Sequence, residues 1–287
     1  MNKMTACFVS TDHLTDRLWF RDDNDFRTGM NYVAIVSYSL NTPILAFILM
    51  SNHVHFVLAC DETDALRFIT EFKRRYSQYY QKKNGTSVLL SHNSVDIRGL
   101  VGEESVERAI AYVQMNCVAA NICSHPVQYP WGTGGCFYHV GENSDRALGE
   151  LSGRAQRRLL LSQQKLPSSY LVTNETYINP GSYVSIQFVE RLFRTPARYN
   201  YFLRQSSKAR IRLESNPLPS FRDQNVIASV QDLCRSLFRE EGTNDLTPDQ
   251  MAELARQIRF RFSADASQIA RVLSVSYEEA VTMLDKL

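Results

Sequence analysis

Two histidines one residue apart are the first candidates for chemistry in this sequence. His53 and His55 lie in the stretch SNHVHFVL, residues 51–58. Because side chains alternate between the two faces of an extended strand, both imidazoles would share one face with Val57, while Val54 and its alternate neighbours form an apolar face. Neutral imidazole is the commonest side-chain metal ligand, so the pair could hold one ion. A half-buried polar face and a pair that contacts a nucleotide are the alternative interpretations.

A tyrosine and an asparagine one helical turn apart are the second candidates. Residues 105–122 are predicted to form a helix, with Ser105 as its cap, and Tyr112 and Asn116 lie together at spacing i to i+4. A phenol can act as a nucleophile, and an amide oxygen can bind a hard cation. The alternative is an interfacial tyrosine hydrogen-bonded to a nearby asparagine. The stripe predicted to be buried beside this pair comprises Val106, Ile110, Val113 and Cys117.

The elements that must position these residues form a recognisable order. Hydrophobic patterning predicts strands over 6–10, 43–49, 53–59 and 95–101, with helices over 22–41, 63–83 and 105–122, the first of them interrupted at Gly29. The order is strand, helix, strand, strand, helix, strand, helix. It predicts an α+β fold: a ferredoxin-like sandwich with helices packed on an antiparallel sheet.

The rest of the chain is predicted to be an all-helical C-terminal extension. Basic helices are expected over 149–165 and 181–203, joined by a polar connection over 167–180. The stretch 215–219 (SNPLP) is the best linker candidate, which gives three predicted domains: 1–140, 141–214 and 215–287. The last domain is expected to hold helices over 225–238, 248–262, 266–273 and 277–287. The final two have the spacing of a helix-turn-helix, a pattern that any small helical domain can produce.

Composition narrows the class of protein. The chain has 287 residues, 44% of them hydrophobic, without a run of eighteen apolar residues, so neither a membrane span nor a membrane partner is expected. Six cysteines without a CxxC motif fit reduced thiols, which predicts a cytoplasmic protein. The net charge is only +2, but residues 71–83 hold five bases against one acid and residues 191–213 hold seven bases and no acid. Such local excess suits phosphate binding, although a solvated helix face is the commoner explanation of one run.

Three motifs together resemble those of a known family. Residues 51–58 resemble the histidine-hydrophobic-histidine (HUH) motif of single-tyrosine transposases, and residues 112–118 (YVQMNCV) resemble their nucleophile helix. Residues 129–131 (YPW) resemble the tyrosine-proline-tryptophan that often follows it. Helix-rich C-terminal extensions are typical of the REP-associated branch of that family. Two positions depart from the pattern, because Ser51 and Cys117 stand where proline is common.

The resemblance implies an activity: metal-dependent cutting and rejoining of single-stranded DNA near hairpins. It implies that His53 and His55 bind a divalent ion, Mg²⁺ or Mn²⁺, that Asn116 completes the site, and that Tyr112 attacks the scissile phosphate to give a 5′-phosphotyrosine. The expected partner is single-stranded DNA with hairpin structure, and a homodimer is compatible with the sequence. Bases interleaved with tyrosines suit phosphate pairing and base stacking, so the predicted DNA contacts are Lys73, Arg74, Arg75, Lys82 and Lys83.

Several alternatives remain at this stage. The protein could be a catalytically silent nucleic-acid-binding descendant of a transposase, or Tyr79 or Tyr80 could be the nucleophile. A histidine-triad nucleotide hydrolase is disfavoured because Val57 stands where its third histidine would fall. A structural zinc site is a further alternative, with Cys123, His125, Cys136 and His139 as its ligands.

Overall fold

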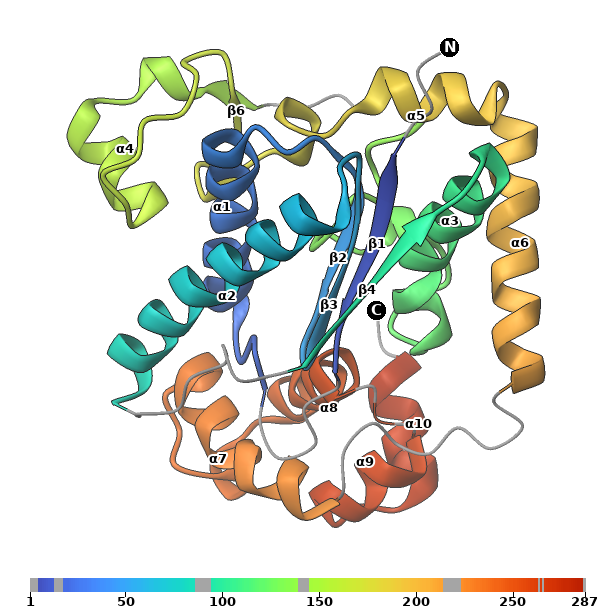
Figure 1. The fold of residues 1–287 in the computed structure, drawn as a ribbon. Helices are drawn as coiled ribbons and strands as arrows, with labels where there is room; N and C mark the ends of the chain where they lie inside the picture. The colour runs from blue at the N-terminus through green and yellow to red at the C-terminus, as the bar shows by residue number, and fades with distance from the viewer. Residues whose placement is uncertain are drawn as a thin grey trace.

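A four-stranded antiparallel sheet is the centre of the fold. A computed structural model of the chain describes residues 5–12, 18–85, 94–138, 145–213, 223–262, 264 and 266–285. Its main sheet has the order β2-β3-β1-β4, and every neighbouring pair of strands is antiparallel. This is the strand order of a ferredoxin-like sandwich, so the α+β prediction is confirmed (Figure 1). The strands are β1 (Ala6–Thr11), β2 (Ile44–Met50), β3 (His53–Leu58) and β4 (Val95–Leu100).

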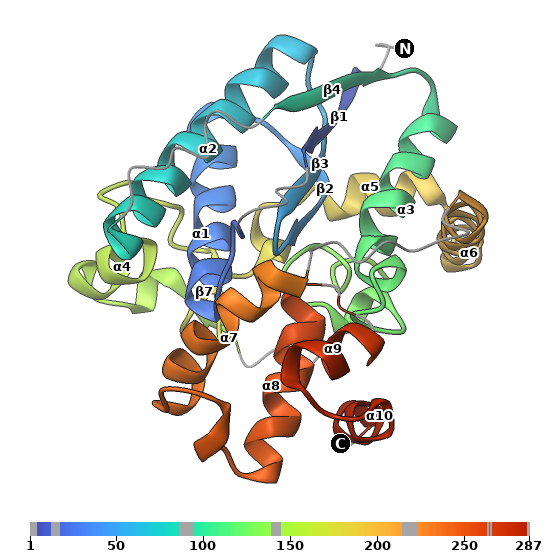
Figure 2. The same ribbon diagram turned by 90° about the horizontal axis from the view of Figure 1, so that it is seen from below.

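Helices cover both faces of this sheet. Helices α1 (Asp23–Leu40) and α2 (Glu62–Asn84) pack on one face, and α3 (Glu103–Ala119) packs on the other, with α6 (Pro196–Leu213) outside it (Figure 2). The alternation in β3 explains this arrangement. Phe56 points towards α2, where its ring contacts those of Phe68 and Phe72, so the histidines must face α3.

Two expectations about the helices need correction, one at Gly29 in α1 and one at Ser105 in α3. The predicted interruption at Gly29 is wrong, because α1 is continuous through it. Glycine is needed there for packing, since a Cβ atom would lie 2.6 Å from Cε1 of Phe20. Ser105 is not the cap of α3 either. The helix begins one residue after Gly102, and the Ser105 hydroxyl donates to the Gly102 carbonyl at 2.9 Å from within the first turn.

The predicted helical extension that follows residue 140 contains strands as well as helices. A small antiparallel sheet, in the order β5-β6-β7, is built from β5 (Arg146–Ala147), β6 (Leu171–Thr173) and β7 (Tyr177–Ile178). The expected helix through Lys165 is also too long, because α4 (Gly153–Leu160) ends where Leu161 adopts a left-handed conformation with φ 46°. Helix α5 (Ile186–Phe193) precedes α6, and buried side chains from Leu148 to Leu203 join the same apolar core as the main sheet.

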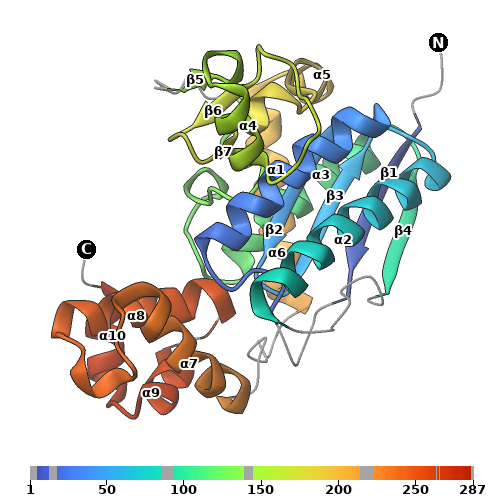
Figure 3. The same ribbon diagram turned by 90° about the vertical axis from the view of Figure 1, so that its left-hand side faces the viewer.

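The last four helices form a second apolar cluster. They are α7 (Asp223–Phe238), α8 (Pro248–Phe262), α9 (Ala266–Leu273) and α10 (Tyr277–Asp285), and they lie beside the lower end of the sheet (Figure 3). Phe260 joins the two clusters, because its ring lies 5.8 Å from that of Phe26 and 5.4 Å from that of Tyr129. The predicted linker 215–219 lies outside the described residues. Among the described helices, none combines the length and the apolar character that a membrane span requires.

The helix-turn-helix pattern is present as α9, a short turn and α10. The described part of α10 carries Glu278, Glu279 and Asp285 and no base. Because carboxylates repel phosphates, this charge pattern is unfavourable for a helix lying in a DNA groove. The structure therefore offers no electrostatic support for DNA contact by α10.

Candidate active site

The two histidines lie side by side on the face of the sheet that α3 covers. His55 is opposite Ser10 on β1 and Ile48 on β2, while His53 is opposite Met50 at the end of the β2–β3 hairpin. Both residues are buried, at 4% exposure for His53 and 2% for His55, and their ring centroids are 4.8 Å apart. Position on an inner strand fixes both backbones, so the pair is a rigid part of the sheet.

Tyr112 on α3 reaches this pair within the same chain. Its ring centroid lies 5.6 Å from that of His55 in an edge-on arrangement. Phe8 on β1 contacts both partners, stacking on His55 at 5.6 Å and meeting Tyr112 edge-on at 5.7 Å. Tyr112 is 39% exposed, whereas both histidines are buried. The Tyr112 side chain is therefore open to the solvent from which a substrate would arrive, whereas both imidazoles are covered.

Asn116 follows Tyr112 by one helical turn and is 1% exposed. Its amide nitrogen donates to the backbone carbonyl of Tyr112 at 2.8 Å. Because the nitrogen is held there, the side-chain oxygen is the atom of Asn116 that could bind a cation.

A hydrogen bond that His53 donates to Asn52 suits His53 for metal binding. The Asn52 side-chain oxygen lies 2.8 Å from Nδ1 of His53, and an amide oxygen can only accept, so Nδ1 carries the proton. That tautomer leaves the lone pair on Nε2, the arrangement that metal-binding histidines usually have. Within the described residues no three or more His, Cys, Asp or Glu side chains gather into a metal-binding group. The two imidazoles thus fit a divalent ion only if oxygens, such as those of Asn116, water and phosphate, supply the other ligands.

Arg98 is a site residue that the sequence analysis missed. It lies on β4 opposite Phe8, on the same face as the histidines, and Asp96 pairs with its guanidinium at 2.6 Å. The pKa of Arg98 is raised, mainly by the hydrogen bond that its guanidinium donates to Asp96 and also by the nearby Tyr112 hydroxyl. A cation on this face would attract the phosphate of a DNA strand. Strand alternation across β4 was the available signal, but only the register shows that Arg98 lies opposite Phe8, whose ring contacts Tyr112.

The predicted DNA contacts on α2 lie across the sheet from Tyr112. Lys73 is only 3% exposed, and burial lowers its pKa to about 8. Arg74 and Arg75 are both held by Glu71 at 2.7 Å. The structure therefore does not bring these side chains to the histidine face.

The other two predicted DNA contacts, Lys82 and Lys83, lie in the last turn of α2. Lys82 is exposed, while Lys83 contacts the carboxylates of Asp22 at 2.5 Å and Asp25 at 2.7 Å. Both are on the face opposite the histidines, so any DNA that they bind is not at the phosphorus that Tyr112 would attack (Figure 2).

The alternative nucleophiles are on that far face too. Tyr79 donates to Asp25 at 2.8 Å, and burial together with that carboxylate raises its pKa. Tyr80 is buried, and Tyr76 is buried with its hydroxyl donating to the Trp19 carbonyl at 2.6 Å. None of these three phenols shares the histidine face.

The tyrosine-proline-tryptophan segment fastens the other edge of the sheet. The Tyr129 hydroxyl donates to the Leu49 carbonyl at 2.7 Å, and the Leu49 amide donates to the Trp131 carbonyl at 2.8 Å. Gly132 then forms an antiparallel bridge with Ile48, and a Cβ atom there would approach the Phe47 carbonyl to 2.7 Å. This segment therefore requires glycine and packs against the edge of β2.

Thr133 ties α3 to that edge. Its buried hydroxyl donates to the Phe47 carbonyl at 3.1 Å and accepts from the Phe47 amide at 3.1 Å and from Nε2 of Gln114 at 2.8 Å. Gln114 is two residues from Tyr112, so this contact helps to fix the nucleophile helix on the sheet. The sequence analysis did not predict this role.

The described members of the proposed zinc set do not gather. Cys123 hydrogen-bonds with Cys117, which lowers the pKa of Cys123 and raises that of Cys117. Nδ1 of His125 accepts from the Val127 amide at 3.3 Å. His139 lies outside the described residues, so the four-ligand set as a whole is not described.

Comparison with known proteins does not identify the family of this chain. Neither a family model nor a curated protein matches the chain. One solved structure, of a REP-associated tyrosine transposase bound to a REP hairpin, is 10% identical, with a TM-score of 0.34, over 46% of this chain and 78% of that one. This is a distant structural similarity. It assigns neither family nor activity.

Proposed function

We propose that this protein cleaves and rejoins single-stranded DNA, with Tyr112 as the nucleophile and with hairpin-bearing DNA of a transposable element as substrate. The observation that carries the proposal is the contact between the Tyr112 and His55 rings, 5.6 Å apart in one chain. The other tyrosines that the sequence offered lie across the sheet. A partly exposed phenol beside two buried imidazoles is the arrangement that nucleophilic attack on a metal-bound phosphate requires.

In the proposed reaction the Tyr112 oxygen attacks a backbone phosphorus. The new tyrosine–phosphorus bond replaces the bond to the 3′-oxygen, which leaves as a 3′-hydroxyl after taking up a proton, while the phenol loses its own. The product is a 5′-phosphotyrosine. Because the phosphodiester energy is kept in this ester, the 3′-hydroxyl of a second DNA end can reverse the step without ATP.

The residues around Tyr112 have separate tasks in this scheme. His53, His55 and Asn116 would hold Mg²⁺ or Mn²⁺, which supplies charge to polarise the phosphate. Phe8 contacts both Tyr112 and His55 and limits the rotation of their rings. Arg98 presents a guanidinium to the same face, where it would pair with a phosphate oxygen.

The test is a covalent adduct. Purified protein, incubated with a labelled hairpin-bearing single strand and Mg²⁺ or Mn²⁺, should give a conjugate that survives denaturation, and mass spectrometry should place the phosphate on Tyr112. Tyr112→Phe should abolish the conjugate while DNA affinity stays close to that of the unmodified protein. A conjugate formed by this variant would contradict the assignment of the nucleophile. Binding without any conjugate in the unmodified protein would instead fit a catalytically silent DNA-binding protein.

A further inference from the structure

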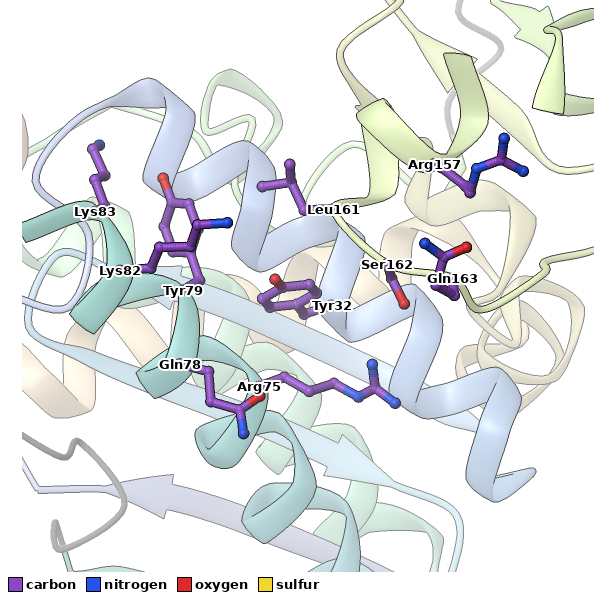
Figure 4. A pocket seen from close by; sticks show the side chains of 10 residues that line it. All are labelled: Tyr32, Arg75, Gln78, Tyr79, Lys82, Lys83, Arg157, Leu161, Ser162 and Gln163. Carbon is purple, nitrogen blue, oxygen red and sulfur yellow. The ribbon is translucent and has the colours of Figure 1, made fainter. Parts of the chain in front are cut away.

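A groove on the far face of the main sheet has the character of an anion-binding site. It has a volume of about 760 Å³ and lies between α2 and the α4 segment, residues 153–163; we name it the α2–α4 groove. Arg75, Lys82 and Lys83 line it from α2, and Arg157 lines it from α4 (Figure 4). None of its ten lining residues is acidic.

Two of these bases are available to a ligand. Lys82 and Arg157 are exposed, and within the described residues no carboxylate lies at ion-pair distance from either. Arg75 and Lys83 are partly neutralised by acids behind the groove, Glu71 for the first and Asp22 with Asp25 for the second. The groove thus carries an excess of positive charge, most of it from Lys82 and Arg157.

The α4 side adds to this charge. Residues 151–174 contain Arg154, Arg157, Arg158 and Lys165 and no acid. All four bases are exposed, and the buried Leu160 turns the opposite side of α4 into the core. Among the described residues no carboxylate pairs with these four bases, so this face carries an excess of positive charge.

The walls of the groove are fixed before any ligand binds. Asn31 on α1 is buried, its amide nitrogen donates to the Leu159 carbonyl at 3.0 Å, and its oxygen accepts from the Ile178 amide at 2.9 Å. The first bond holds the end of α4 against α1, and the second holds β7 there. Tyr32 and Tyr79 lie between the bases of the two ends, and Asp25 holds the Tyr79 hydroxyl (Figure 4). A preorganised groove loses less entropy when a ligand binds.

We propose that the α2–α4 groove binds the sugar–phosphate backbone of the DNA hairpin, at a distance from the bond that is cut. The choice of DNA as ligand rests on the proposed function. Bases on both walls can pair with successive phosphates, and the tyrosines and Leu161 between them offer a surface for sugars. Because the main sheet separates the groove from Tyr112, one DNA molecule that uses both must pass around the sheet. The groove therefore positions the substrate and takes no part in cleavage.

The test compares two variants with the same loss of charge. Lys82→Gln/Arg157→Gln removes the two unpaired bases of the groove, and Arg235→Gln/Arg239→Gln removes two exposed bases at the end of α7. Binding of a labelled hairpin-bearing strand to the full-length protein is measured by fluorescence anisotropy at several salt concentrations. The groove variant should bind about tenfold more weakly. The slope of its log affinity against log salt concentration should correspond to the release of roughly one to two fewer counterions. The α7 variant should keep the salt dependence of the unmodified protein.

Two further measurements separate this inference from the proposed activity. A strand that contains the cleaved segment but no hairpin should bind both variants equally well, because it cannot reach the groove. Equal loss of hairpin affinity in both double variants would overturn the inference, even if the covalent adduct forms. Selective loss in the groove variant, with no adduct in the unmodified protein, would support the groove and contradict the nuclease. Arg157→Glu, a single exposed change, should weaken hairpin binding further than Arg157→Gln and provides a second test should the double variant fold poorly.

Discussion

A phenol can attack DNA only where the strand can reach its oxygen, and this requirement separates Tyr112 from its rivals. Tyr76 and Tyr129 are buried, and burial raises the pKa of both hydroxyls. Tyr79 is bound to a carboxylate, which raises its pKa further. Those three phenols are hydrogen-bonded parts of the framework. Tyr112, in contrast to these three, lies beside the imidazoles.

Asn52 is expected to control metal affinity through His53. Without its oxygen, Nδ1 of His53 no longer has the partner that fixes the tautomer, so Asn52→Ala should raise the Mn²⁺ concentration for half-maximal adduct formation by about 10- to 100-fold. Titration calorimetry with Mn²⁺ and no DNA gives the same comparison without catalysis. Asn121→Ala, a change on a surface turn, is the control. An unchanged Mn²⁺ affinity in Asn52→Ala would show that this hydrogen bond does not prepare a metal ligand.

Lys73 is expected to make stability depend on pH. Burial lowers its pKa from 10.5 to about 8 in the folded protein, so between these values the unfolded chain binds a proton that the folded chain does not. The free energy of unfolding therefore rises with pH across that range, and below pH 8 the charged lysine costs the fold roughly 2 to 3 kcal/mol.

Replacing Lys73 by methionine should remove that cost. Denaturant unfolding should show Lys73→Met as the more stable protein at pH 7, with the difference from the unmodified protein closing towards pH 10.5. For Lys82→Met, at an exposed position, the difference in unfolding free energy from the unmodified protein should not change with pH in this way. A constant difference for Lys73→Met across pH 7 to 10 would mean that Lys73 keeps an ordinary pKa.

Individual residues differ in how well the sequence could predict them. His53, His55, Tyr112 and Asn116 were proposed from residue type and spacing, and the first three meet as ring contacts in the structure. Lys73 lies one turn after the buried Ile69, so helical spacing already placed it on the apolar stripe, but the run of bases around it concealed this. Arg98 needed the pairing of β1 with β4, a long-range contact that spacing alone does not contain.

At the scale of elements, the position of α3 decides whether the site exists. The helix supplies Tyr112, and Thr133 connects it to the edge of β2 through three hydrogen bonds of one hydroxyl. Thr133→Val keeps the shape but leaves the Phe47 and Gln114 groups without that partner. We expect the free energy of unfolding to fall by about 1 to 3 kcal/mol.

The same change should slow adduct formation, because α3 is then held less firmly. Thr133→Ser retains the hydroxyl and is the matched control, and it should keep most of both properties. Denaturant unfolding and the rate of adduct formation, measured on the same preparations, check the two effects. Full adduct rates in a destabilised Thr133→Val protein would show that this link supports the fold without positioning Tyr112.

The long elements were predictable and the short ones were not. The four main strands and three sheet-packed helices each carry a hydrophobic period or, in β2, an unbroken apolar run, and their observed ends fall within a few residues of the predicted ones. Strands β5, β6 and β7 have two or three residues each, which is too short for a period, and they form through pairing between distant segments. Helix α4 ends at Leu161, which adopts a left-handed conformation. Because this residue is not a glycine, the sequence gives no signal for the helix end.

At the scale of the whole molecule, the main sheet divides two surfaces. The histidines, Tyr112 and Arg98 share the α3 face, whereas the α2–α4 groove is on the face covered by α1 and α2. The C-terminal helices pack against the end of the sheet through Phe260, and Arg259 donates to the Asn121 carbonyl at 2.9 Å. The helical unit thus lies at one end of the sheet (Figure 3).

The contact between Tyr112 and His55 within one chain has a consequence for mixtures of inactive proteins. Each His55→Ala molecule has a phenol without its imidazole, and each Tyr112→Phe molecule has the reverse defect. If one copy must supply both groups, an equimolar mixture of the two stays inactive, and the activity per molecule of the unmodified protein does not change on dilution. Rescue in the mixture would mean that helices are exchanged between copies, and that two chains together make each centre.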